Sequence, residues 1–195
     1  MKKSAAYSFM KERLENEFAK LDKNKLTPWI FMATDHGLDV TTLDGSKVKY
    51  QGIEFSGTAR LVFWDRFSVP FLMDIISRGF AATREFCERH NIATKPALDE
   101  TAELLKEGID RTFKRMVDID RRLRGKGSPN SVEQYNPSTE TAKTLAFLDE
   151  RLAAEKLLIP KQRNSLNKFY EEQKFWIWAI GALIALAGIV AQIFI

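Results

Sequence analysis

The residue types best suited to chemistry gather in a basic cluster between Arg111 and Lys126. This window holds seven Lys or Arg residues against two Asp residues, whereas the net charge of the whole chain is only +4. Clustered cations bind the phosphate groups of lipids, nucleotides and nucleic acids. We therefore predict an anionic-ligand site, with nucleic acid not the favoured ligand. We assign to this site Lys114, Arg115, Arg121, Arg122, Arg124 and Lys126.

A structural interpretation of the same cluster remains open. Acidic residues crowd the other end of the predicted helix, at Asp99, Glu100, Glu103, Glu107 and Asp110. Acids near the amino end of a helix and cations near its carboxyl end match the helix dipole. The same charge order also suits pairing with an antiparallel helix. Helix stability therefore explains the cluster as well as a ligand does.

Histidine and cysteine offer little for catalysis or metal binding. His36 lies in the tetrapeptide 34–37, which is typical of a turn, and no nucleophile motif accompanies it. Cys87 and His90 are three residues apart, but two ligands do not complete a zinc site. We interpret them as a buried thiol and a helix-terminal histidine. The sequence has no phosphate-binding glycine loop or nucleophile elbow, so we assign no catalytic residue, metal ligand or cofactor.

Carboxylates in the predicted sheet keep an enzymatic alternative open. They are Asp39, Asp44, Glu54 and Asp65. A metal-dependent hydrolase or nuclease needs two or three converging carboxylates, together with a lysine that Lys47 or Lys49 would have to supply. The aromatic run 63–71 would stack on bases in a nucleic-acid binder. We interpret this run as core, because the chain contains 14 Phe residues.

Apolar residues at intervals of three and four predict the helices that position these residues. They cover 3–24, 70–91 and 96–124, and a further helix begins near Ser138. The third helix carries a heptad-like seam, which predicts a coiled coil or a helical hairpin with the helix that follows. The seam consists of Leu98, Ala102, Leu105, Ile109, Thr112, Met116, Ile119 and Leu123.

Residues 29–64 change to a β-branched and aromatic composition that favours strands. We expect strands within 29–33, 38–43, 48–50, 53–55 and 59–64, with a two-residue hairpin turn at Asp44-Gly45. The fold class predicted is α+β: a small antiparallel β-meander of three or four strands packed by helices, a long helical hairpin, and a single C-terminal transmembrane helix.

The C-terminal segment 175–195 contains no charged residue and is long enough to cross a bilayer as a helix. Lys174, Trp176 and Trp178 would mark the membrane interface, and the cations before the span would keep the N-terminal part in the cytoplasm. We expect a tail-anchored, single-pass protein. Its parts would be a cytoplasmic domain over 1–159, a juxtamembrane helix over 160–174, and the span.

One face of the predicted span carries small residues that let two helices approach closely. Gly181, Ala185, Gly188 and Gln192 fall on this face, and Gln192 would form a hydrogen bond to a partner helix. This pattern predicts a homo-oligomer. Gly and Ala are also simply common in membrane helices, so self-association and ordinary composition both remain open.

The sequence resembles no family, so function is predicted from the residues alone. We expect a tail-anchored membrane protein whose cytoplasmic domain binds a partner or signal and self-associates at the bilayer, with a membrane-perturbing effector as one version. The alternatives are a membrane-tethered metal-dependent hydrolase or nuclease, and a non-catalytic binder of phosphate-bearing ligands. One cysteine excludes an internal disulfide and suits a reducing compartment.

Overall fold

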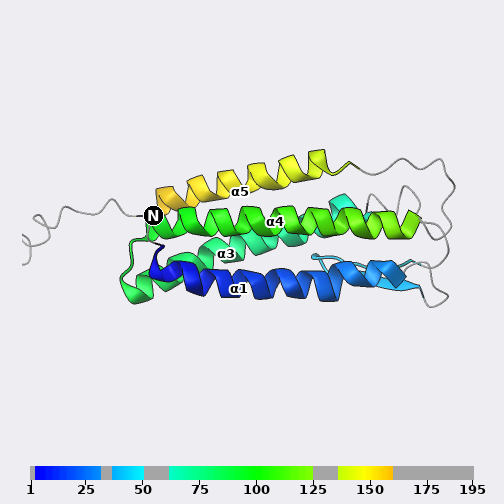
Figure 1. Ribbon diagram of the computed structural model, residues 1–195, viewed down its shortest axis with the longest axis horizontal. Coiled ribbons are helices and arrows are strands. Elements are labelled where there is room, and N and C mark those ends of the chain that lie inside the picture. Colours follow the sequence, from blue (N-terminus) through cyan, green and yellow to red (C-terminus); the bar gives the residue numbers. More distant parts are fainter. Residues whose placement is uncertain (1–2, 32–36, 51–61, 125–135, 160–195) are drawn as a thin grey trace, which may run out of the picture. The chain divides into compact units, whose positions relative to one another are not determined.

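A computed structural model describes residues 3–31, 37–50, 62–124 and 136–159 (Figure 1). The contacts between its residues divide the chain into two units, Met1–Leu158 and Ile159–Ile195. All the helices and strands named below belong to the first unit.

Four long helices build this unit: α1 (Ala5–Leu21), α3 (Val69–His90), α4 (Thr94–Arg124) and α5 (Ser138–Leu158). Helices α3 and α4 pack on each other, and both contact α1 and α5. Figure 1 shows α1 and α5 on opposite sides of this central pair. The predicted helices are therefore confirmed, with ends shifted by a few residues.

Helices α1 and α4 run parallel, and the residues that join their ends are 93 and 96 positions apart in the sequence. At one end of the bundle, the backbone N–H of Ser4 donates to Glu100 Oε1 at 2.9 Å, so a carboxylate of α4 lies at the amino end of α1. At the other end, Asp22, just after α1, pairs with Arg115 of α4. Both α3 and α5 run the opposite way. Phe9 and Glu17 of α1 meet Phe86 and Arg78 of α3. Asp99 and Lys106 of α4 meet Lys156 and Asp149 of α5.

Helix α4 is the central element, and its apolar stripe is wider than a two-helix seam. All eight residues of the predicted seam are buried. Ala97, Thr101, Leu104 and Phe113 are buried as well, because α4 contacts α1, α3 and α5 at once. The wide stripe is that of a bundle helix with three neighbours.

The predicted meander is wrong, because the described residues contain one hairpin and no third strand. Strands β1 (Leu38–Thr41) and β2 (Lys47–Tyr50) pair antiparallel, with Val40 opposite Val48. The turn is also wider than predicted: five residues connect the strands, 42–46, and Gly45 carries the positive φ of 86°. The predicted strand 53–55 lies outside the described residues.

The described parts of the remaining predicted strands, residues 29–31 and 62–64, lie in short helical turns. After α1 the chain continues as a π-type turn η1 (Asp22–Leu26) and a 3-10 turn η2 (Thr27–Phe31), and a second π-type segment η3 (Val62–Ser68) precedes α3. In η3, Phe63, Trp64 and Phe67 are all buried, which is the spacing of one helical face. The fold is therefore mainly helical with a small hairpin, and the predicted α+β class is corrected accordingly.

The membrane part of the predicted fold is not supported. Among residues 3–31, 37–50, 62–124 and 136–159, no helix has both the length and the apolar character needed to cross a bilayer. The expected juxtamembrane helix, span, interface residues and small-residue face all fall within 160–195, outside the described residues. The assignment as a tail-anchored, single-pass protein is therefore withdrawn.

Aromatic side chains fill the core at the hairpin end of the bundle. Trp29 is fully buried and contacts the rings of Tyr50, Phe63 and Phe67 at centroid distances of 5.4, 4.9 and 5.6 Å. Trp64 stacks on Phe113 of α4 at 6.3 Å. Three rings of the run 63–71 are buried, so it is a packing element, as predicted, and not a surface for stacking bases.

Candidate anion-binding site at the carboxyl end of α4

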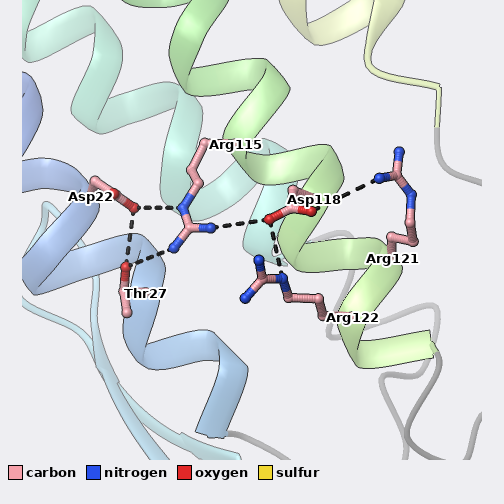
Figure 2. A network of polar contacts seen from close by, with 6 residues as sticks. All are labelled: Asp22, Thr27, Arg115, Asp118, Arg121 and Arg122. Carbon is pink, nitrogen blue, oxygen red and sulfur yellow. Dashed lines mark hydrogen bonds and ion pairs between the residues drawn. The ribbon is translucent and has the colours of Figure 1, made fainter.

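Arg115 fastens the carboxyl half of α4 to the turns that follow α1. Its Nε lies 3.1 Å from Asp22 Oδ1 of η1, and its Nη2 donates to Thr27 Oγ1 of η2 at 3.3 Å (Figure 2). The Thr27 hydroxyl in turn donates to Asp22 at 3.1 Å. The third nitrogen, Nη1, lies 3.1 Å from Asp118 Oδ2. Three of its nitrogens are therefore engaged within the fold, and its role is structural.

The carboxylate of Asp118 lies beside three arginines of the same helix. Besides Arg115, it faces Arg122, whose Nε lies 3.2 Å from Oδ2, and Arg121, whose Nη1 lies 3.9 Å from Oδ1 (Figure 2). The last distance is too long for a hydrogen bond. The network of three arginines and two aspartates carries a net charge of +1.

Arg121 and Arg122 are the cations that this network leaves open to solvent. Their side chains are 61% and 57% exposed, against 29% for Arg115. A guanidinium has five N–H donors, and one shared carboxylate cannot engage them all. Donors of Arg121 and Arg122 therefore remain for an incoming anion, on either side of the Asp118 carboxylate (Figure 2).

The same contacts also stabilise the helix. Asp118 and Arg122 are four residues apart with the acid first, the favourable order for such a pair, and Asp110 and Lys114 repeat it at 2.6 Å. Each exposed pair contributes roughly 0.3–0.5 kcal/mol. The structural interpretation of the cluster therefore holds for Arg115, whereas Lys114, Arg121 and Arg122 keep solvent-facing donors.

The other predicted members of the site are not described in detail. Arg124 is the last residue of α4, and Lys126 lies outside the described residues.

Of the histidine and cysteine residues considered for chemistry, His36 lies outside the described residues. Cys87 is 1% exposed, and burial raises the pKa of its thiol. His90 ends α3 with its ring 4.4 Å from that of Phe86. The prediction of a buried thiol and a helix-terminal histidine is confirmed.

The carboxylates of the enzymatic alternative form no three-ligand metal group in the part of the chain that the structure covers. No group of three His, Cys, Asp or Glu side chains there is placed to hold a metal ion. Asp39 is exposed on β1, Asp65 pairs with Lys143 at 3.0 Å, and Glu54 is not described. Hydrogen bonds from the Thr42 hydroxyl and from Ser46 lower the pKa of Asp44.

A groove of about 840 Å³ separates the hairpin from η3 and the start of α3. Apolar and charged side chains mix along it, among them Val48, Tyr50, Met73, Asp65 and Lys143. Two carboxylates of the enzymatic alternative, Asp44 and Asp65, lie on its wall. The ion pair Lys143–Asp65 occupies part of this wall, so the groove is not assigned a ligand.

Sequence reasoning missed the partners that organise the basic cluster. Asp22 and Thr27 lie 93 and 88 residues from Arg115, a separation that no local pattern reveals. The sequence did contain a signal for the shared carboxylate, because Asp118 and Arg122 are four residues apart, a spacing at which an acid and a cation on one helix form an ion pair. No known protein-family model, curated protein or solved structure matches the chain.

Proposed function

We propose that this chain is a binding module that holds a phosphate-bearing ligand at the carboxyl end of α4, through Arg121 and Arg122. One observation carries the proposal: the side chains of Arg121 and Arg122, consecutive in the sequence, are more than half exposed, and both lie beside the Asp118 carboxylate that Arg115 also contacts. Phosphate oxygens are acceptors that arginine binds by paired, charge-assisted hydrogen bonds.

Asp118 and Arg115 position Arg122, and Arg121 lies beside them. Arg115 is held by Asp22 and Thr27, and it holds Asp118 in turn. Asp118 then orients Arg122 through Nε, which leaves the two terminal nitrogens of that side chain for a ligand. A ligand carrying two or more negative charges is favoured, because it must outweigh the repulsion from Asp118.

The shared chemistry of the ligand is a phosphate or pyrophosphate group, carried by a nucleotide or by a lipid headgroup. The test titrates the full chain with inorganic pyrophosphate and with a nucleoside triphosphate in a calorimeter. In parallel, it measures cosedimentation with vesicles of phosphatidylglycerol. Binding to vesicles without binding to the soluble phosphates would identify a headgroup as the source.

The variant Arg121→Gln/Arg122→Gln removes both guanidinium groups from an exposed helix end. We expect at least a tenfold weaker affinity, about 1.4 kcal/mol, for whichever phosphate probe the unaltered chain binds. The matched control is Arg13→Gln/Arg89→Gln, which removes the same charge from exposed positions on α1 and α3. Equal weakening in both variants, or no binding of any phosphate probe by the unaltered chain, would refute the proposal.

A further inference from the structure

We propose that a hollow between the end of α1, the turn η1 and helix α3 is a second binding site. Its ligand is a small organic monoanion, a carboxylate with a short apolar body. The hollow has a volume of about 170 Å³. It shares no residue with the pair Arg121 and Arg122, so this inference is independent of the proposed function.

Lys25 is the residue that points to an anion. Where the structure describes side chains, five Lys or Arg residues are half-buried: Lys25, Arg84, Arg115, Arg151 and Lys156. The last four each pair with a carboxylate. The Nζ atom of Lys25 instead lies over the ring of Phe71, 5.1 Å from its centroid. A ring attracts a cation but carries no net charge, so this half-buried positive charge is left uncompensated.

The turn η1 brings the polar groups of the hollow together. It continues α1 and directs neighbouring side chains to two different helices: Asp22 pairs with Arg115 of α4, whereas Lys25 lies over Phe71 of α3. Asn24, an exposed amide of the same turn, also lines the hollow. A second ammonium comes from Lys20 in the last turn of α1, with a side chain that is 70% exposed. An anion in the hollow would therefore meet donors from three side chains.

Apolar side chains line the same hollow and define the rest of the ligand. Leu21 and Ile75 are buried, and Phe71 is half-buried. A purely ionic ligand would leave these surfaces wet, so the favoured ligand carries an apolar group beside its charge. Pockets for drug-sized molecules run to ~300–1,000 Å³, so the apolar group that fits here is short.

The charges around the hollow favour a single negative charge on the ligand. Arg78 also lines it, but Glu17 at 2.6 Å and Asp74 at 2.8 Å engage its guanidinium. With Lys20 and Lys25, three cations therefore face two carboxylates, which leaves a net charge of +1. A monoanion neutralises this charge, whereas a phosphate dianion exceeds it and has no apolar group for the hollow.

The test titrates the isotope-labelled full chain with benzoate and follows its backbone amides by NMR. We expect shifts in η1 and at the start of α3, with a dissociation constant on the order of 1 mM or tighter. Benzamide has the same ring without the charge, and acetate has the charge without the ring, so each should bind at least tenfold more weakly. Equal affinity for benzoate and benzamide, or no shift in η1 with benzoate, would overturn the proposal. Phosphate binding at Arg121 and Arg122 is a separate measurement, so either proposal can fail without the other.

The variant Lys25→Met removes the charge and keeps an apolar contact with the Phe71 ring, because the thioether also packs on aromatic rings. We expect at least a tenfold loss of benzoate affinity. Lys23→Met is the matched control, since Lys23 is an exposed lysine of the same turn that does not line the hollow. Its affinity should stay within about twofold of the unaltered chain. Equal weakening in both variants, or none in Lys25→Met, would contradict the assignment. If Lys25→Met does not fold, the comparison of benzoate with benzamide on the unaltered chain still decides.

Discussion

Phe18 of α1 lies so close to Gly108 of α4 that a Cβ atom placed on the glycine would be 2.1 Å from ring atom Cε2. Two further ring atoms would lie within 2.6 Å of it. The two parallel helices therefore meet where one has no side chain, and the ring of the other fills that space. Gly108 is needed in α4 for this contact, although glycine weakens a helix.

Replacing Gly108 with Ala is expected to destabilise the chain. A methyl group in the space of the Phe18 ring costs about 1–3 kcal/mol of overpacking, which exceeds the ~1 kcal/mol that alanine gains in helix propensity. Denaturant unfolding gives the difference. The matched control is Gly79→Ala in α3, where the new Cβ would meet Leu14 at an ordinary 3.4 Å. This control should raise stability by up to ~1 kcal/mol, and a shift of the same sign in both variants would contradict the packing argument.

Arg115 is expected to stabilise the bundle more than its neighbour Lys114 does. Arg115→Ala removes contacts to Asp22, Thr27 and Asp118, and leaves Asp22 and Asp118 without this cation, so we expect a loss of roughly 1–3 kcal/mol. Lys114→Ala breaks one exposed pair with Asp110 and should cost at most about 0.5 kcal/mol. Thermal unfolding of both variants checks this. Equal losses would show that Arg115 contributes only as a surface charge.

The pair between Glu17 and Arg78 makes part of the stability depend on pH. Burial raises the pKa of Glu17, but the hydrogen bond and positive charge of Arg78, together with the charges of Lys20 and Arg13, lower it by more, so the net pKa lies below its ordinary value. A carboxyl group with a lowered pKa in the folded chain contributes stability above its unfolded pKa, and that contribution disappears as the pH falls through the folded pKa.

Glu17→Gln should therefore be less stable than the unaltered chain at pH 7, by roughly 0.5–1 kcal/mol, and the difference should vanish well below pH 4. Urea unfolding at a series of pH values measures it. Glu85→Gln is the control, because Glu85 and Arg89 form a pair that is about two-thirds exposed. A difference for Glu17→Gln that stayed constant down to pH 2 would rule out the ion pair as its cause.

Cys87 is expected to react slowly with thiol reagents in the folded chain. Its side chain is buried with Ala6 and Ala97, and burial raises the pKa of the thiol, so both access and thiolate content are low. The rate with a chromogenic disulfide at pH 8 should be at least about a hundredfold lower than in denaturant. Ser8→Cys in a Cys87→Ala background supplies an exposed thiol on α1 for comparison. Similar rates for the two thiols would place Cys87 at the surface.

The helices were predictable because their apolar spacing is regular over several turns. The seam of α4 is buried as expected, and α3 ends at His90 where Asn91 takes the left-handed conformation, with φ of 52°. The segments predicted as strands failed for a different reason. Trp29, Phe63 and Trp64 favour strands by composition, but burial in one aromatic cluster decides their conformation, and short irregular turns have too few residues to show a period.

Of the candidate site, only the cluster of charged residues could be predicted from the sequence. The basic window identifies Arg121 and Arg122, but it also selects Arg115, which contacts to Asp22, Thr27 and Asp118 engage within the fold. Asp22, 93 positions earlier in the sequence, decides that Arg115 is engaged within the fold while other arginines stay exposed to solvent. The spacing of charges along one helix does not contain that information.

The parallel arrangement of α1 and α4 has a consequence for synthesis of the chain. The Ser4–Glu100 contact spans 96 positions, so the first helix leaves the ribosome long before the surface that covers it exists. At ~5–20 residues per second, the apolar side chains of α1 wait several seconds or more for α4. During that interval they are a target for chaperones, and α1 reaches its native environment only after α4 has been made.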